Sequence, residues 1–155
     1  TSSSFTLDLK KWLSICEAYL AGQTPYHATL PTDSIAANAA IALETRDRGL
    51  TALRDAQIEL GTSVRKLLDG RGLPSVADAE FAAPSVVVVH TDDPALKSGA
   101  AFKTVGLQVA AGVPLMCGEP ENWSTFRLGL FGLDKLGDVA GTVQRLDDAL
   151  IRLGR

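Results

Sequence analysis

The sequence predicts an α+β domain in which N-terminal helices are followed by a small, mostly antiparallel sheet covered on one face by helices. Apolar residues recur at helical spacing before residue 70, the period becomes that of strands at residues 85–90 and 126–131, and helical spacing returns after residue 134. Helices followed by short strands that are interleaved with further helices are typical of this fold class. A length of 155 residues corresponds to one sizeable core.

The first predicted helix covers residues 9–20. Its apolar residues recur every three or four positions, and Asp8 stands where a helix cap is expected. These apolar residues are Leu9, Trp12, Leu13, Cys16, Tyr19 and Leu20. The next segment, residues 21–34, contains one glycine and two prolines and is predicted to be a loop held by packing.

Two further helices are predicted between this loop and residue 70. The second begins after Thr32 or Asp33, either of which can cap it, and ends near Gly49. The third follows Thr51 and ends at Gly70. Its inner face consists of Leu53, Ala56, Leu60, Val64, Leu67 and Leu68.

The second half of the chain contains the predicted strands. Residues 85–90 are a β-branched run after Pro84 and are predicted to form a buried strand. Asp93 and Pro94 then predict the start of a helix that continues to about Val105.

A further strand, an alternating strand and a long helix complete the predicted fold. Residues 113–117 are predicted to be a strand at the sheet edge, because Pro114 cannot donate to a ladder. Residues 126–131 are predicted to form the next strand, in which side chains that face the core alternate with side chains on the opposite face of the sheet. The core set is Phe126, Leu128 and Leu130, and the opposite set is Arg127, Gly129 and Phe131. Helical spacing from residue 134 to residue 154 predicts one long terminal helix that covers the sheet.

Composition and charge argue against several classes of function. Hydrophobic residues make up 46% of the chain, and a net charge of −3 without a basic block gives no support for nucleic-acid binding. Neither a membrane span nor a secretory signal is expected from the pattern. Cys16 and Cys117 stand far apart without a histidine at metal-ligand spacing, so neither a disulfide framework nor a metal site is predicted. We therefore expect a cytoplasmic protein.

Arg127 is the first candidate binding residue. Strand alternation places it on the face opposite the core, beside the small Gly129 and the aromatic Phe131. A planar guanidinium fixed on a strand can bind a carboxylate through two parallel hydrogen bonds. The missing side chain at Gly129 suggests that something approaches the backbone there. A solvated surface arginine or a structural ion pair is the alternative interpretation of Arg127.

Tyr26, His27 and Thr29 form a second candidate site in the loop before the second helix. Hydroxyl groups beside a helix start can hold a phosphate, whereas a packing tyrosine and a capping threonine are the alternative. His27 and His90 have no serine or cysteine motif beside them, so a nucleophilic triad is not supported.

Other motifs carry less information. Asp92 and Asp93 are interpreted as helix caps, and Glu119 and Glu121 as solvated loop carboxylates. The sequence lacks GxGxxG, GxxxxGK[ST] and HExxH patterns, so dinucleotide, P-loop and zinc-peptidase sites are not supported.

Three segments in order resemble a known family. They are LDLKKW at residues 7–12, PYHATLP at 25–31, and FRLGLFG at 126–132 followed by a long helix. Together they resemble the C-terminal part of the class V, fold-type I aminotransferases that depend on pyridoxal phosphate. Within that class the chain is most similar to alanine-glyoxylate, serine-pyruvate and 2-aminoethylphosphonate-pyruvate aminotransferases. FRLGLFG and YHAT are reasonably specific, whereas the helices between them are generic.

The resemblance implies roles for three residues. Arg127 would grip the α-carboxylate of the substrate by a two-pronged salt bridge. Tyr26 and Thr29 would reach across a dimer interface to the phosphate of the neighbouring subunit's pyridoxal phosphate. The implied partners are a second copy of the protein in a homodimer and small amino acid and 2-oxo acid substrates.

The residues that perform the chemistry in this family are expected to precede this chain. The family's catalytic lysine lies well upstream of the YHxT loop, and Lys10 and Lys11 lack its Gly- and Ser-rich surroundings. The resemblance therefore implies a C-terminal fragment with no catalytic residue of its own. Residues 1–72 would link the large and small domains and contribute to the dimer interface, and residues 73–155 would form the small domain.

The predicted function is that of part of an aminotransferase, which moves an amino group from a small amino acid to a 2-oxo acid or glyoxylate. The chain alone is predicted to be inactive. The alternative is a stand-alone α+β module that binds a small carboxylate through Arg127, or dimerises, without catalysis. A lyase or desulfurase with the same fold would need a cysteine nucleophile, but the isolation and apolar flank of Cys117 favour an inert thiol.

Overall fold

The structure is a computed structural model that describes residues 4–114 and 116–155. Its contacts divide the chain into two compact units, Thr1–Ala42 and Leu43–Arg155. None of the described helices is both long enough and apolar enough to cross a lipid bilayer.

The first unit contains helix α1, Leu9–Leu20, and the start of helix α2, Thr32–Arg48. The Asp8 carboxylate caps α1 by accepting the backbone N–H of Lys11 at 3.1 Å, as the sequence predicts. Ile15 is the buried residue of α1, and most of the remaining apolar side chains of the helix are exposed. This unit therefore has very little core of its own.

The second unit contains a three-stranded antiparallel sheet, which confirms the predicted α+β class. Its strands are β1, Val86–His90, β2, Ala110–Ala111, and β3, Thr125–Gly129, in the order β1-β3-β2. Arg127 lies in the central strand, opposite Val88 on one side and Ala110 on the other.

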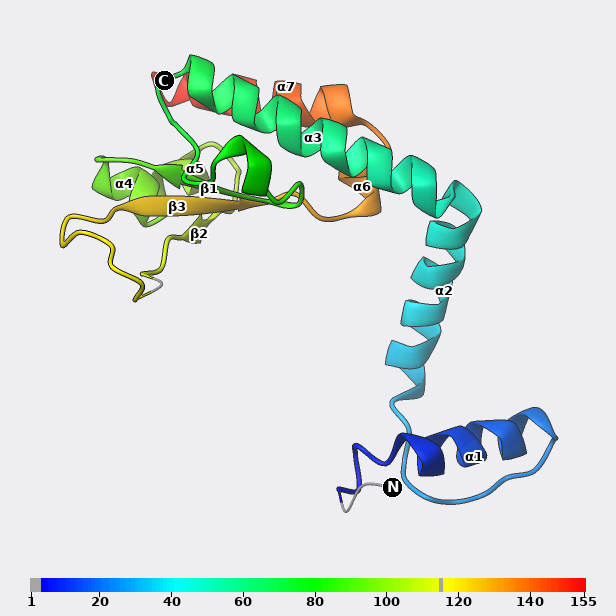
Figure 1. Ribbon diagram of the computed structural model, residues 1–155. Helices are drawn as coiled ribbons and strands as arrows, with labels where there is room; N and C mark the ends of the chain where they lie inside the picture. The colour runs from blue at the N-terminus through cyan, green and yellow to red at the C-terminus, as the bar shows by residue number, and fades with distance from the viewer. Residues whose placement is uncertain (1–3, 115) are drawn as a thin grey trace. The chain divides into compact units, whose positions relative to one another are not determined.

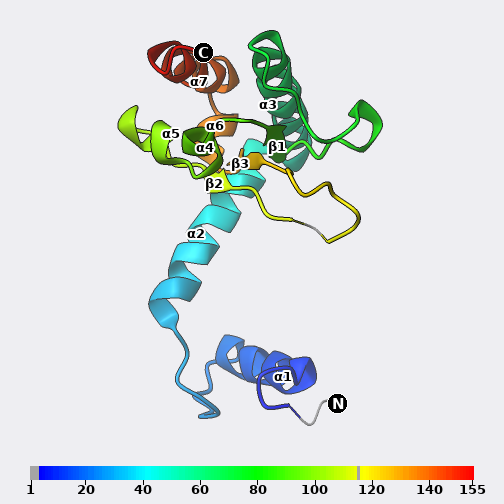
Figure 2. The same cartoon turned by 90° about the vertical axis from the view of Figure 1, so that its left-hand side faces the viewer.

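Helices α3, Leu50–Gly70, and α7, Val139–Arg152, lie side by side over one face of this sheet (Figures 1 and 2). The core between these two helices and the sheet contains inner residues that the sequence predicts for α3 and β3, together with Phe102, which the sequence does not single out. Its most deeply buried members are Leu60, Val64, Leu68, Val87, Val89, Leu96, Phe102, Phe126 and Leu150. Burial of this apolar surface is the main stabilising contribution to the second unit.

Two helices that the sequence predicts as continuous are interrupted. The predicted helix 93–105 is split into α4, Pro94–Lys97, and α5, Ala100–Thr104, because Gly99 takes a left-handed conformation with φ of 76°. The predicted terminal helix is split into α6, Leu133–Leu136, and α7. Asp138 leaves helical geometry between them and caps α7, accepting the N–H of Gly141 at 2.9 Å.

The prediction of a strand at residues 113–117 is wrong for the part that the structure describes. The strand lies earlier, at Ala110–Ala111, and Leu115 is outside the described residues. Backbone pairing to β3 ends at Gly112, whose N–H donates to the carbonyl of Thr125 at 2.9 Å. Pro114 follows two residues later and has no N–H with which to continue the ladder.

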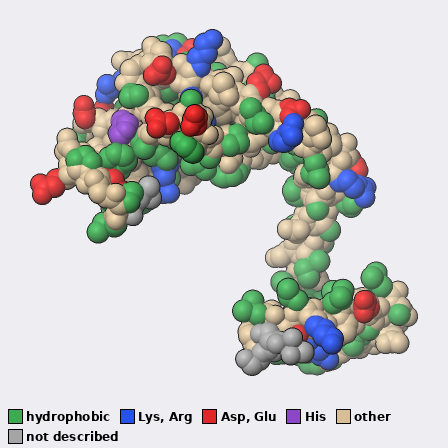
Figure 3. Space-filling view, in the orientation of Figure 1, with side chains coloured by type: hydrophobic (Ala, Val, Ile, Leu, Met, Phe, Trp, Pro, Cys, Tyr) green, Lys and Arg blue, Asp and Glu red, His purple; other side chains and the backbone are tan. Residues whose placement is uncertain are grey.

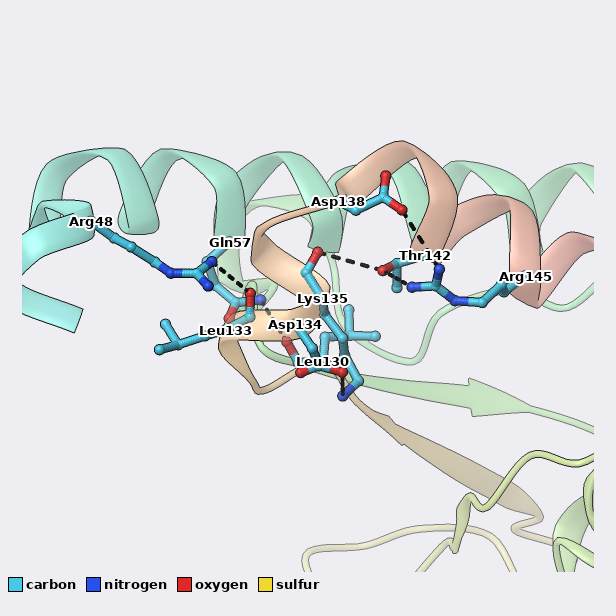
Figure 4. A network of polar contacts seen from close by, with 9 residues as sticks. All are labelled: Arg48, Gln57, Leu130, Leu133, Asp134, Lys135, Asp138, Thr142 and Arg145. Atoms are coloured by element: carbon cyan, nitrogen blue, oxygen red, sulfur yellow. Dashed lines mark hydrogen bonds and ion pairs between the residues drawn. The ribbon is translucent and has the colours of Figure 1, made fainter. Parts of the chain in front are cut away.

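Helix α3 holds the ends of the sheet through polar groups as well as through the core. The Gln57 side chain donates to the carbonyls of Pro84 and Leu130, at 3.1 and 3.3 Å (Figure 4 shows the Leu130 contact). One and two turns later, a Cβ at Gly61 would lie 2.4 Å from the Pro84 oxygen, and Arg65 donates to the carbonyls of residues 83 and 86. Burial lowers the pKa of the Arg65 guanidinium from its ordinary value, but the group remains charged. The helix therefore fixes both the start of β1 and the chain just after β3.

The turn between α6 and α7 carries its own polar network (Figure 4). Arg145 donates to the Thr142 hydroxyl at 2.7 Å and lies 3.6 Å from the Asp138 carboxylate. Arg48, in the last turn of α2, donates to the carbonyl of Leu133 at 3.1 Å. These contacts connect α6 to its neighbours at the end of the sheet where β3 finishes.

Candidate carboxylate and phosphate sites

Arg127 stands at the middle of β3 and faces away from the core. Its neighbours Phe126 and Leu128 are buried against the helices, whereas Arg127 is half-buried on the opposite face. This is the alternation that the sequence predicts for residues 126–131, because successive side chains of a strand point to opposite sides.

The guanidinium of Arg127 is held by one hydrogen bond and keeps two nitrogens available. Its Nε donates to the carbonyl of Ala111 in β2 at 3.0 Å. Within residues 4–114 and 116–155, no carboxylate forms an ion pair with Arg127. Since the Nε is engaged, the two terminal nitrogens are left as parallel donors, which is the arrangement that matches a carboxylate. A structural ion pair within the described chain is therefore not the explanation of this arginine.

Gly129 leaves the backbone beside Arg127 open. It is exposed, its φ is not in the left-handed region, and a Cβ built there would meet only the Phe131 ring, at an ordinary 3.5 Å. Neither backbone geometry nor internal packing requires a glycine at this position.

An aromatic pair that sequence reasoning missed lies at the start of β3. His90 pairs with Thr125 in the sheet, and its ring packs edge-on against Trp123 with centroids 5.0 Å apart. The two residues are far apart in sequence, and only the strand register brings them together. Trp123 and Thr125 also line a cavity of about 490 Å³, and Glu119 and Glu121 lie at its loop side.

Tyr26 and Thr29 lie in the first unit, on the loop between α1 and α2. Tyr26 is 86% exposed and Thr29 is exposed. Between them, His27 packs inward: its ring stacks on Phe5 at 4.6 Å and meets Trp12 edge-on at 5.0 Å. Tyr26 and Thr29, on either side of this anchored ring, are exposed, so Tyr26 is not a packing residue of this unit.

Asp93 has a structural role. Asp93 caps α4 by accepting the N–H of Ala95 at 2.8 Å, as predicted, and its carboxylate pairs with Arg155. The Ala95 hydrogen bond, assisted by Arg155, lowers the pKa of Asp93.

Cys117 carries an exposed free thiol, and its backbone N–H donates to the Glu119 carboxylate at 2.8 Å. No group of His, Cys, Asp and Glu side chains suited to a metal ion occurs in the described part of the chain.

Comparison with known proteins gives a structural match. No family model matches the chain, and no curated protein matches it in sequence. The crystal structure of alanine–glyoxylate aminotransferase from Nostoc sp. is similar to it with a TM-score of 0.70, over 92% of this chain and at 19% sequence identity. The chain shares its fold with part of that aminotransferase. It spans 37% of the length of the Nostoc protein.

Proposed function

We propose that the chain forms the substrate-carboxylate and cofactor-phosphate part of a pyridoxal-phosphate-dependent aminotransferase of the class V type. The reaction would move an amino group from a small amino acid to a 2-oxo acid or glyoxylate. The shared fold with an alanine–glyoxylate aminotransferase supports the proposal. The observation that carries it is Arg127, a fixed guanidinium on an open sheet face with both terminal nitrogens unengaged by any described carboxylate.

In this proposal Arg127 binds the α-carboxylate that amino acid and 2-oxo acid substrates share. Two parallel N–H···O bonds orient the substrate as well as hold it, because the guanidinium fork and the carboxylate match in spacing. Gly129 lets the substrate approach the strand without meeting a side chain. The residue thus positions a substrate and does not itself exchange a proton.

Tyr26 and Thr29 are proposed to donate to the phosphate of the cofactor in the neighbouring subunit of a homodimer. The fit rests on their exposure and on the inward anchoring of His27, which leaves two hydroxyls on a fixed loop. Pyridoxal phosphate supplies the electron sink of amino transfer when it is bound. The chain itself fits only the phosphate end of that cofactor, since its lysines are exposed or half-buried. These are Lys10, Lys11, Lys66, Lys97, Lys103 and Lys135.

The purified 155-residue chain is expected to be inactive when mixed with pyridoxal phosphate, alanine and glyoxylate. A lysine that captures the cofactor needs a desolvated or electrostatically activated amine, and the chain's solvent-accessible lysines do not provide one. Borohydride treatment followed by mass spectrometry checks this, with an unrelated lysine-rich protein as the control. A pyridoxyl label that accumulates selectively on one lysine, together with amino transfer, would overturn this assignment of roles.

The chain is expected to form dimers at micromolar concentration. Apolar side chains stand out along the surface of α1 (Figure 3), where Leu9, Leu13 and Leu20 are exposed. Exposed apolar patches drive association, and homo-oligomers most often close as two-fold dimers. Sedimentation checks this, with Leu13→Glu expected to weaken the dimer. A monomer whose first unit is nevertheless well ordered would favour the stand-alone module.

A further inference from the structure

The orientation of Arg127 depends on a strand of only two residues. Strand β2 supplies the Ala111 carbonyl that accepts the Arg127 Nε at 3.0 Å, and no other described group bonds this guanidinium. If β2 moved away from β3, Arg127 would lose its only fixed partner and regain its rotamer freedom. The feature that holds β2 against β3 therefore decides where the two terminal nitrogens point.

Gly112 follows β2 directly and is the point of closest approach to β3. Its N–H donates to the Thr125 carbonyl at 2.9 Å. A Cβ at this position would lie 1.8 Å from the Thr125 Oγ1 and 2.4 Å from the Thr125 carbonyl oxygen. Its φ is outside the left-handed region, so the requirement for glycine is steric and not conformational.

Thr125 cannot retreat to make room for a side chain. It is 1% exposed, and it pairs with His90 of β1 on its other side. Its neighbour Phe126 is buried in the core. Because the central strand is fixed from both sides, a side chain at Gly112 would displace the shorter and more exposed β2.

We infer that Gly112 is a positioning residue for Arg127: by allowing β2 to lie against Thr125, it keeps the Ala111 carbonyl on the Arg127 Nε and presents the terminal nitrogens to a carboxylate. The inference rests on the proposed function and adds a residue that touches neither substrate nor cofactor. Replacing Gly112 by alanine should free the guanidinium. Refixing one long side chain on binding would then weaken carboxylate affinity by about three- to tenfold.

The test uses ¹⁵N-labelled full chain and glyoxylate as the carboxylate probe. The Nε–Hε signal of Arg127, assigned by its loss in Arg127→Lys, reports the hydrogen bond to Ala111 directly. In the unmodified chain this proton should exchange with solvent more slowly than the Nε proton of Arg145, which contacts Thr142 and Asp138 through its terminal nitrogens. Glyoxylate should shift the Arg127 signals.

The variants separate positioning from general damage. Gly112→Ala should raise the solvent-exchange rate of the Arg127 Nε proton to the rate of the Arg145 Nε proton, and it should weaken glyoxylate binding. Gly70→Ala, where an added Cβ meets no atom within 4 Å, should change neither. A folded Gly112→Ala with an unchanged Nε signal would overturn the inference. So would fast Nε exchange in the unmodified chain, a result that stands even if Gly112→Ala fails to fold. A protected Nε together with no glyoxylate binding would instead overturn the carboxylate-binding role of Arg127, on which the proposed function rests.

Discussion

Replacing Arg127 by alanine is expected to weaken transition-state stabilisation, measured from kcat/KM for amino acid and 2-oxo acid substrates, by about 2–5 kcal/mol in the proposed enzyme. This is the range for removing one partner of a desolvated charge pair. This corresponds to a rate loss of about 30- to 5000-fold. In the alanine variant the substrate carboxylate still loses its water on binding but no longer gains two hydrogen bonds from the guanidinium. The desolvation cost is therefore left uncompensated. Steady-state kinetics with alanine and glyoxylate measure it.

The matched control is Arg127→Lys. Lysine keeps the positive charge but cannot make two parallel hydrogen bonds or donate in plane to the Ala111 carbonyl. Its kcat/KM should lie between those of the unmodified protein and the alanine variant, and cofactor affinity should change little in either variant. Substrate kinetics within about threefold of the parent for Arg127→Ala would assign Arg127 to a surface role.

Replacing Phe126 by alanine is expected to destabilise the second unit by about 3–5 kcal/mol. Phe126 is fully buried in the central strand, and its ring packs on that of Phe102 with centroids 5.1 Å apart. Truncation removes apolar burial and leaves a cavity between β3 and the helices that cover it. Urea unfolding followed by circular dichroism measures the change in the free energy of unfolding.

Substitutions at the neighbouring positions 126 and 127 serve as controls for each other in the unfolding experiment. Arg127→Ala should leave the unfolding midpoint almost unchanged, because the side chain is half-buried and makes one hydrogen bond to the chain. Phe126→Leu should cost far less than Phe126→Ala, because it keeps most of the buried volume. Equal destabilisation by Arg127→Ala and Phe126→Ala would contradict the placement of these two residues on opposite faces.

The long elements of the fold could be predicted because their patterns are strong and local. Helices α1 and α3 show apolar residues at threes and fours, and Asp8 caps α1 as expected. Strands β1 and β3 show a β-branched run and an alternating pattern, which suffice to place Phe126 inside and Arg127 outside. In α3 and β1 the period of burial matches the geometry of the element, whereas in α1 most of the periodic apolar side chains are exposed and Ile15 is the buried residue.

The errors in the second unit have local causes that periodicity does not report. Gly99 interrupts the helix after Asp93 because it takes a left-handed conformation, although the apolar spacing continues across it. The sequence does not predict the position of strand β2, because that position depends on Gly112 fitting against Thr125, a contact between residues 13 positions apart. Such steric requirements become visible only when the two strands are side by side.

The candidate site likewise has features that local sequence patterns predict and features that depend on how the strands pair. The position of Arg127 and Gly129 on the strand face opposite the core could be predicted from alternation. The partner of the Arg127 Nε could not, because a backbone carbonyl leaves no mark in the sequence. The pairing of His90 with Trp123 likewise depends on the strand register.

The most direct test of the account compares alanine with ethylamine, which is alanine without its carboxylate, as amino donors in the proposed enzyme. The account predicts that Arg127→Ala lowers kcat/KM for alanine by at least about 30-fold and leaves that for ethylamine, which is slow from the outset, within about twofold. An equal loss with both donors would contradict it, because Arg127 would then act on something other than the substrate carboxylate.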